Sequence, residues 1–201
     1  MRNNPVYRVF NGIRDCVNWA KRDYAAPSPH FIKQGCLLRN ATPMATWVET
    51  GTFLGQTTQL LAKNGTYVYS IEPEPGLFAR AERLFSRHHN VKILNGTSEE
   101  IFPDLLPRIK GDVNFWLDGH YSAGITFKGP QDTPIIDELA CISRNISQFG
   151  RVCVLVDDIR CFNPQLPEYA TYPSLDVLVN WAREHKLVWH IEHDIFIAKT
   201  V

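Results

Sequence analysis

The stretch ATWVETGTFLG, residues 45–55, decides the fold class because a short apolar run passes directly into a turn that contains two glycines. The apolar half has the length and composition of a buried strand. Gly51 permits a sharp turn and close approach of a ligand to the backbone, and Gly55 allows the next helix to pack closely. We expect that helix to cover residues 54–64 and to end at Gly65, so the stretch predicts a βα unit.

Short apolar runs and amphipathic runs continue to alternate along the chain, which is typical of repeated βα units around a parallel sheet. Further strands are expected at residues 67–71, 91–94, 113–117, 152–156, 187–192 and 195–199. Only His193 and Asp194 separate the last two runs, so these predict a hairpin rather than a crossover. The predicted fold is a Rossmann-like, doubly wound α/β sheet, mostly parallel, with a C-terminal antiparallel hairpin.

The predicted helices carry apolar residues at helical spacing or a recognisable first turn. A capping box opens the helix expected from residue 97, and Thr133-Pro134 supplies the N-cap and first residue of the helix expected from residue 134. They are expected at residues 77–85, from 97 onward, from 134 to about 147, and at 175–185.

The length of 201 residues indicates one domain. Residues 44–201 form the predicted Rossmann-like core, and residues 1–43 form a helical cap, broken at Pro27 and Pro29, across one end of the sheet. Residues 1–40 carry seven basic residues against two acidic ones. A solvated helical face is the preferred interpretation of this bias, and a basic lip over an anionic substrate is the alternative.

Composition argues against several classes of partner. Lysine plus arginine and aspartate plus glutamate both number 21, so no net charge attracts nucleic acid or an anionic membrane. No apolar run is long enough to span a bilayer, and the N-terminus lacks the pattern of a signal peptide. Five scattered cysteines without CxxC spacing suit reduced thiols. We therefore expect a cytoplasmic protein that binds neither nucleic acid nor membrane.

Polar residues follow the second and third predicted strands, at the edge of the sheet where such folds bind ligands. Glu72 lies about twenty residues beyond Gly51, where an acid can accept hydrogen bonds from both hydroxyls of a ribose. Ser98 and Glu99 follow the third strand and are placed to border an adenine. Each feature alone also suits an ordinary polar strand ending, but three consecutive strand ends together indicate a nucleoside site.

Acids also follow the fourth and fifth predicted strands. Asp118 ends one, and Asp157 and Asp158 end the other. Neighbouring strands lie about 5 Å apart, so these carboxylates can converge on one hard divalent cation, Mg²⁺ first, then Mn²⁺ or Ca²⁺. In an arbitrary α/β protein, acids that merely cap helices are the commoner explanation. His120 lies two residues beyond Asp118 and titrates in the range that suits a general base.

Taken in order, VETGTFLGQTT, SIEPEPGLFARA, VKILNGTSEE, FWLDGH and VLVDD resemble the class I S-adenosylmethionine-dependent methyltransferases over roughly residues 45–160. More narrowly, they resemble the catechol O-methyltransferase-like enzymes and the metal-dependent sugar O-methyltransferases of macrolide biosynthesis. The resemblance implies a seven-stranded sheet and a cofactor site made of Glu49, Gly51, Thr52, Phe53, Gly55, Thr57, Glu72, Ser98, Glu99 and Asp118. It further implies that Asp118, Asp157 and Asp158 are metal ligands.

The resemblance implies methyl transfer from S-adenosylmethionine to a hydroxyl of a sugar, polyketide or similar small molecule, with a divalent metal. Asp118 and His120 are the predicted catalytic residues, although the lysine that catechol-type enzymes carry after this acid is absent. A homodimer is plausible. The alternatives are a metal-independent methyltransferase, a non-catalytic S-adenosylmethionine-binding protein and, more remotely, an NAD-dependent dehydrogenase. In the last case Phe53 replaces the second glycine of the fingerprint.

Overall fold

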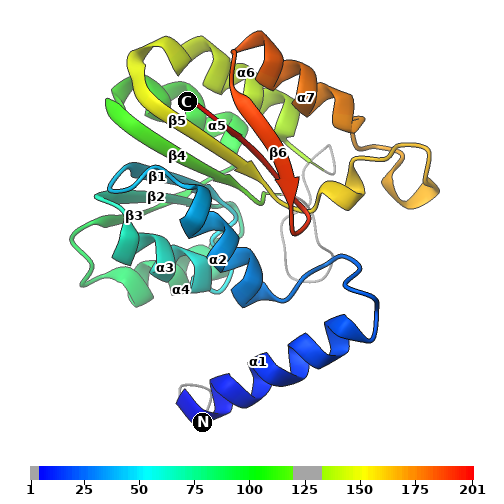
Figure 1. Cartoon of the computed structure of the whole chain (residues 1–201). Coiled ribbons are helices and arrows are strands. Elements are labelled where there is room, and N and C mark those ends of the chain that lie inside the picture. Colours follow the sequence, from blue (N-terminus) through cyan, green and yellow to red (C-terminus); the bar gives the residue numbers. More distant parts are fainter. Residues whose placement is uncertain (1–4, 120–132) are drawn as a thin grey trace.

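A single twisted sheet organises the chain, and its strand order is β3-β2-β1-β4-β5-β7-β6 (Figure 1). The computed structural model describes residues 5–119 and 133–201. Strands β1 to β5 pair in parallel, while β7 pairs antiparallel with both β5 and β6. The seven-stranded, mostly parallel sheet with a C-terminal hairpin is therefore confirmed.

The predicted strand positions agree with the structure to within a few residues. The strands are β1 (Thr46–Thr50), β2 (Tyr67–Glu72), β3 (Val91–Asn95), β4 (Gly111–Leu117), β5 (Phe149–Val156), β6 (Val188–Glu192) and β7 (Ile195–Lys199). The α-helices are α1 (Pro5–Ala20), α2 (His30–Asn40), α3 (Gln56–Asn64), α4 (Pro75–Phe85), α5 (Ser98–Leu105), α6 (Ile135–Asn145) and α7 (Leu175–Glu184). No helix within these described ranges is long and apolar enough to cross a membrane.

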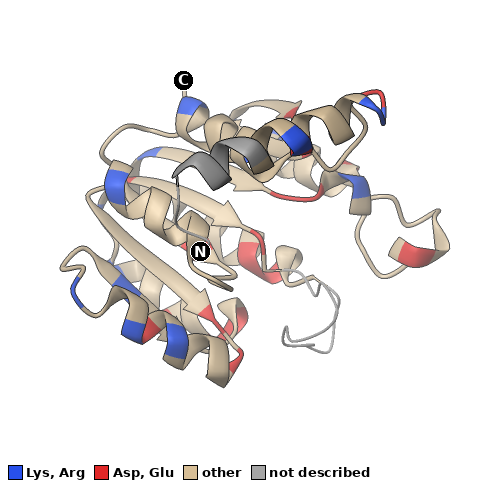
Figure 2. Cartoon of the chain, turned by 90° about the horizontal axis from the view of Figure 1, so that it is seen from below, with Lys and Arg blue, Asp and Glu red and all other residues tan. Residues whose placement is uncertain are grey.

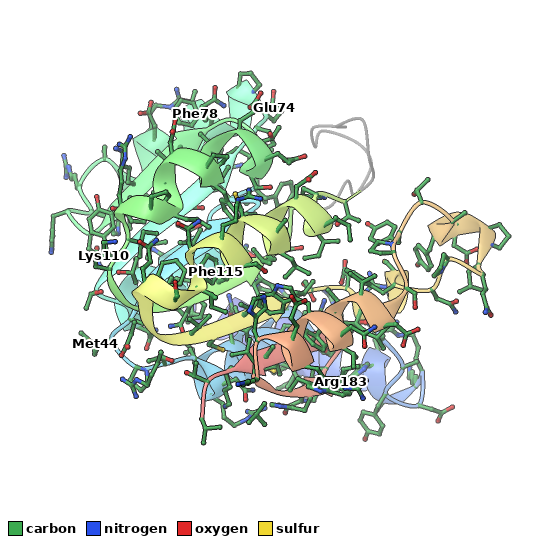
Figure 3. All side chains as sticks on the ribbon, turned by 90° about the horizontal axis from the view of Figure 1, so that it is seen from above. Met44, Glu74, Phe78, Lys110, Phe115 and Arg183 are labelled. Carbon is green, nitrogen blue, oxygen red and sulfur yellow. The ribbon has the colours of Figure 1, made fainter. Side chains whose placement is uncertain are left out.

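Helices cover both faces of the sheet (Figure 1). On one face α5, α6 and α7 pack against the apolar side chains of β4 and β5, and Phe115 lies fully buried in this layer (Figure 3). On the other face α2 and α3 pack through Leu37 and Leu61 against Trp47 and Trp116. Because both faces are covered, the central strands β4 and β5 end in long apolar runs, as is typical of this architecture.

Predicted helix boundaries differ from the structure by one or two residues at several places. Helix α3 begins at Gln56 rather than Leu54, because Gly55 adopts a left-handed conformation with φ +77° and serves as the N-cap. Helix α6 begins at Ile135 with Pro134 as its N-cap, so Thr133 lies one residue outside the expected position. The capping box of α5 is confirmed, since the Thr97 side chain and the Glu100 side chain bond reciprocally to the backbone.

The N-terminal region has two parts that behave differently. Helix α2 lies against a face of the sheet through the buried Cys36 and Leu37, rather than only across one end as predicted. Helix α1 extends away from the sheet (Figure 1), and its last turn reaches the β6–β7 hairpin, where Trp19 contacts His193 in an edge-to-face arrangement. Helix α2 is thus the part of the N-terminal region that can contribute to a site at the sheet.

The topology places a ligand site between β1 and β4. From β1 the chain proceeds to β2 and β3 on one side and then returns to β4 on the other side. The connections diverge at this switch point, and in open α/β sheets ligands bind in the crevice that results at the carboxyl ends of the strands. Acidic residues gather along this edge of the sheet, as Figure 2 shows.

Candidate functional site

The turn after β1 brings the backbone of two strands into direct contact. Gly51 has φ +88°, and a side-chain carbon at this position would lie 2.6 Å from the carbonyl oxygen of Asp118. Both the conformation and the crowding therefore require glycine. Thr50 lies beside the same contact, because its Oγ1 accepts a hydrogen bond of 3.2 Å from the Asp118 N–H. The predicted ends of the first and fourth strands thus meet at the switch point.

Glu49 is a fully buried carboxylate that is only half satisfied. Its Oε2 accepts hydrogen bonds from Thr58 Oγ1 at 2.6 Å and from Ser70 Oγ at 2.5 Å. Its Oε1 has no hydrogen-bond partner among the residues that the structure describes. Burial raises the pKa of Glu49 to about 8, although the two hydroxyls oppose the rise. A buried acceptor without a donor is costly and indicates a place where a ligand donor fits.

Thr52 and Thr57 differ in their relation to this carboxylate. Thr52 is buried and its Oγ1 lies 2.6 Å from Ser70 Oγ, so it reaches Glu49 through Ser70. Thr57 is half-buried, and the neighbouring Thr58 is the threonine that bonds Glu49. The sequence motif located the turn correctly but did not distinguish these two adjacent threonines.

Glu72, at the end of β2, closes the loop after β1. Its Oε2 accepts a hydrogen bond of 2.7 Å from the Phe53 N–H, and its Oε1 accepts one of 3.1 Å from the Glu74 N–H. Burial raises the pKa of Glu72, and these two bonds oppose the rise. Phe53 adopts φ +47°, an uncommon conformation for a residue other than glycine, and its side chain is 45% exposed. The carboxylate therefore fixes a loop that presents an aromatic ring to solvent.

The third predicted strand end contributes one buried and one exposed side chain. Ser98 is buried and its Oγ donates a hydrogen bond of 3.3 Å to Oε2 of the exposed Glu99. Strand β3 is joined to β2 at this end, because Asn95 Nδ2 donates to the Glu72 carbonyl at 2.9 Å. The residues predicted to contact the ribose and adenine therefore occupy adjacent strand ends.

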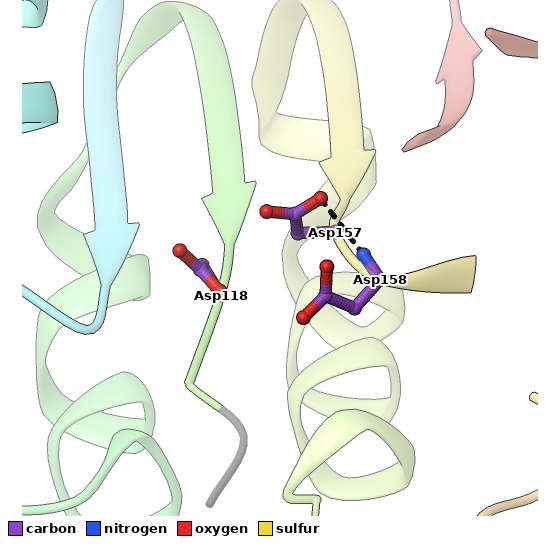
Figure 4. Close-up of side chains that lie close together, drawn as sticks. All are labelled: Asp118, Asp157 and Asp158. Carbon is purple, nitrogen blue, oxygen red and sulfur yellow. Dashed lines mark hydrogen bonds between the residues drawn. The ribbon is translucent and has the colours of Figure 1, made fainter. Parts of the chain in front are cut away.

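The three predicted metal ligands converge, as Figure 4 shows. Asp118, Asp157 and Asp158 each offer a carboxylate oxygen, and these oxygens lie within 4.8 Å of one another. Asp158 adopts a left-handed conformation with φ 55°, and its N–H donates to Asp157 Oδ1 at 2.8 Å. Oxygen ligands at this spacing suit Mg²⁺, Mn²⁺ or Ca²⁺. The chemistry and spacing of the donors therefore fit a hard divalent ion.

Lys33 of α2 enters the same cluster. Its Nζ lies 2.5 Å from Asp157 Oδ1, 2.8 Å from Asp158 Oδ1 and 3.9 Å from Asp194 Oδ2. Only 8% of Lys33 is exposed, so the interpretation of the N-terminal basic residues as a solvated face is wrong for this one. Burial lowers the pKa of Lys33, but Asp157 and Asp158 together raise it above its ordinary value. The pair Asp157–Asp158 is thus bridged by a charged ammonium.

Arg160 is a second cation at the cluster. Its Nη1 lies 2.6 Å from Asp158 Oδ1 and also contacts Asp194 Oδ2. Asp194 lies in the turn between β6 and β7, where its carbonyl accepts from the Ile159 N–H at 3.1 Å. The hairpin at the edge of the sheet is therefore connected to the carboxylates after β5.

Glu138 of α6 is a buried acid that the sequence motifs did not indicate. Its Oε1 has no hydrogen-bond partner within the described residues, and it lies 3.6 Å from where a side chain on Gly119 would begin. Burial raises the pKa of Glu138 to about 7, against opposing hydrogen bonds from Ser98 and Thr50. A small pocket between β4, β5 and α6 has Glu138, Asp157 and Tyr172 in its wall.

His120, the predicted base, lies outside the residues that the structure describes, as do all residues from 120 to 132. Another histidine, His30, belongs to the first turn of α2, one turn before Lys33. Desolvation lowers the pKa of His30, and the Asp118 carboxylate opposes this effect. The first turn of α2 therefore faces the acidic cluster with Lys33, whereas His30 is exposed and close enough for Asp118 to affect its pKa.

Several solved structures with the same fold are methyltransferases. The N-methyltransferase NodS from Bradyrhizobium japonicum WM9 superposes with a TM-score of 0.55 at 12% identity, covering 84% of this chain and 93% of that chain. Its complex with S-adenosyl-L-homocysteine gives 0.54 at 12% identity, covering 84% of each chain. A SAM-dependent methyltransferase from Aquifex aeolicus gives 0.51 at 13% identity, covering 83% of this chain and 87% of that one. The fold is that of the class I methyltransferases.

The same fold includes enzymes with other acceptors. The 23S rRNA methyltransferase ErmE gives a TM-score of 0.50 at 14% identity and covers 84% of this chain and 66% of that chain. No protein-family model and no curated protein matches the sequence. A shared fold does not define a substrate, so the acceptor has to follow from the chemistry of the site.

Proposed function

We propose that the chain is a S-adenosylmethionine-dependent O-methyltransferase acting on a hydroxyl of a small molecule such as a sugar or polyketide. The observation that carries the cofactor part is the unpartnered Oε1 of Glu49, buried beside the Gly51 turn at the switch point. The methionine portion of the cofactor carries an ammonium group, which is the kind of donor that this oxygen lacks. An ammonium–carboxylate hydrogen bond is stronger than one between neutral groups.

The neighbouring strand ends would hold the nucleoside portion. Each oxygen of Glu72 already accepts one backbone hydrogen bond, and a carboxylate oxygen has a second lone pair for a ribose hydroxyl. Ser98 and Glu99 would border the adenine. The exposed ring of Phe53 supplies apolar surface at the same turn. Thr52, Gly55 and Thr57 are the other residues of this turn that we assign to the cofactor. This arrangement supports the residue assignment made from the sequence.

When bound, S-adenosylmethionine supplies a sulfonium methyl group for attack by an oxygen nucleophile. The role of the chain is to orient that oxygen and to take its proton. Asp118, Asp157 and Asp158 would hold a divalent ion that orients the acceptor hydroxyl and lowers its pKa. His120 remains the predicted base. The pocket beside Glu138 and Asp157 lies next to these acids and is proposed as part of the acceptor site.

Calorimetry tests the cofactor assignment directly. Titration with S-adenosylhomocysteine is expected to show binding to the native chain and roughly tenfold or greater weakening in Glu49→Gln, because a charged hydrogen bond is lost. Glu184→Gln changes an exposed carboxylate of α7 and serves as the matched control. Tight binding of NAD without binding of S-adenosylhomocysteine would contradict the proposal.

A radiolabelled methyl-transfer assay tests the acceptor. Hydroxylated sugars and polyketide-type phenols are expected to be labelled, and amines and ribosomal RNA serve as comparison substrates. Labelling of RNA alone would refute the small-molecule assignment. Cofactor binding with no turnover on any acceptor would instead favour a non-catalytic binding protein.

The position of Lys33 favours one alternative, a methyltransferase that uses no metal. An ammonium group already lies between Asp157 and Asp158, and it neutralises part of their charge. Under this second function, methyl transfer survives chelation with EDTA and survives Asp158→Ala. Loss of transfer in both cases, with restoration by Mg²⁺ in the first, supports the metal-dependent function.

A further inference from the structure

The Lys33 ammonium lies where a metal bound by Asp157 Oδ1 and Asp158 Oδ1 would lie. A divalent ion lies about 2.0–2.6 Å from its oxygen ligands. Lys33 Nζ lies 2.5 Å from Asp157 Oδ1 and 2.8 Å from Asp158 Oδ1, which is the same space. Two cations at this separation repel strongly within a buried site. An ion bound by the Oδ1 atoms of both carboxylates therefore has to displace the ammonium.

We propose that the Lys33 ammonium competes with divalent cations for binding to Asp157 and Asp158. Binding of a divalent metal then releases Lys33 and loosens the first turn of α2. The proposal rests on the metal site of the proposed function. It adds a residue that sets the metal affinity and a helix that responds to metal.

Charge in the cluster explains why a metal is still attracted. The carboxylates of Asp118, Asp157, Asp158 and Asp194 face two cations, Lys33 and Arg160, so the described side chains leave a formal excess of two negative charges. Lys33 thus lowers the attraction for a divalent ion without abolishing it. Arg160 bonds Asp194 as well as Asp158, and it keeps a partner when Asp158 binds metal.

The first turn of α2 depends on these carboxylates. The N-cap of α2 is Pro29, with no side-chain cap, and the first turn contains no acidic residue. A lysine there is disfavoured by the positive end of the helix dipole. The carboxylates offset the positive charge of Lys33 and the positive end of the helix dipole. By contrast, the second half of α2 is held by the buried Leu37 and by Asn40, whose Nδ2 lies 3.4 Å from Glu192 Oε2.

Binding of Mn²⁺, followed by electron paramagnetic resonance on the full chain, tests the competition. Lys33→Met keeps the aliphatic stem and removes the charge, and it is expected to bind Mn²⁺ on the order of tenfold more tightly than the native chain. Lys33→Arg keeps the charge and is expected to bind no more tightly than the native chain. Lys63→Met removes an exposed lysine of α3 and controls for overall charge.

Hydrogen exchange gives a second readout that does not depend on activity. Mn²⁺ is expected to accelerate exchange of the amides at the start of α2 in the native chain and to have no further effect in Lys33→Met. Circular dichroism verifies that each variant is folded. If Lys33→Met does not fold, Lys33→Gln is used in its place. Equal Mn²⁺ affinity of Lys33→Met and the native chain, with weaker binding in Asp158→Asn, overturns the inference while leaving the metal site intact. Absence of Mn²⁺ binding in every variant overturns both, whereas S-adenosylhomocysteine binding still tests the cofactor assignment separately.

Discussion

Replacing Glu49 with glutamine is expected to change how the stability of the chain depends on pH. In the folded chain burial raises the pKa of Glu49 to about 8 from the ordinary 4.5. At a pH between these two pKa values, Glu49 holds a proton in the folded chain that it has lost in the unfolded chain. The free energy of unfolding therefore falls as pH rises through this window. Glutamine is neutral throughout and keeps the shape of the protonated side chain, so its contribution does not vary with pH.

The size of the effect follows from the two pKa values. Between pH 6 and pH 9 the folded Glu49 passes from almost fully protonated to mostly ionised, whereas in the unfolded chain it is ionised at both. Linkage then gives a loss of about 2–3 kcal/mol from Glu49 alone in the native chain. Other titrating groups, including Glu138 and Asp157, contribute to both proteins and cancel in the comparison.

Urea unfolding followed by tryptophan fluorescence measures this difference. The native chain and Glu49→Gln are each unfolded at pH 6 and pH 9, and the variant is expected to gain about 2–3 kcal/mol relative to the native chain on going to the higher pH. Glu184→Gln is expected to follow the native chain. A relative stability of Glu49→Gln that is the same at both values refutes the assignment of Glu49 as a buried, protonated acid.

Three further outcomes are expected from the same region of the molecule. Burial raises the pKa of Glu138 to about 7, so Glu138→Gln should remove a smaller dependence of about 1–2 kcal/mol over the same pH range. Unfolding curves that parallel those of the native chain would contradict this. Gly51→Ala should lower the free energy of unfolding by about 1–3 kcal/mol and abolish S-adenosylhomocysteine binding, because φ is +88° and the Asp118 carbonyl oxygen lies 2.6 Å from the new carbon. The control is Gly35→Ala in α2, which has open space around it and should be neutral or stabilising. S-adenosylmethionine binding at pH 7 should release close to one proton, because its ammonium group stabilises the ionised form of Glu49. Calorimetry in buffers of different ionisation enthalpy measures the number of protons released. Proton uptake would show that another group dominates.

The features that were predictable from sequence are those that local patterns encode. Apolar runs of strand length located β1 to β5, and the acids directly after them fell at the carboxyl edge because parallel strands all end there. The short His193-Asp194 connection predicted the hairpin, which β6 and β7 form. Positions that depend on backbone conformation, such as the start of α3 after Gly55, were displaced by one or two residues.

Contacts between distant parts of the chain were not predictable in the same way. Lys33 occurs in a helix with an ordinary amphipathic pattern, and only the packing of α2 on the sheet brings its ammonium to Asp157. Glu138 follows Asp137 in the first turn of α6, where acids are common because they favour a helix N-terminus. Its burial depends on how α6 lies against β4, which periodicity does not define. Thr58 rather than Thr57 bonds Glu49 because helix phase, not the motif, selects the inward-facing side chain.

The bonds of Asp194 link the order in which the chain is made to the completion of the cluster. Its carboxylate contacts Arg160 and lies 3.9 Å from Lys33, while its carbonyl bonds the Ile159 N–H. Lys33 is synthesised long before Asp194. A nascent chain can therefore form most of the parallel sheet while the acids after β5 still have no contact with the β6–β7 turn. Arg160 and Lys33 already share Asp158, and they gain Asp194 as a second shared partner only when the hairpin folds back onto β5. The cluster therefore lacks this partner until the hairpin has been made, and shortening the hairpin turn would disturb the site without altering any residue at the carboxyl ends of the parallel strands.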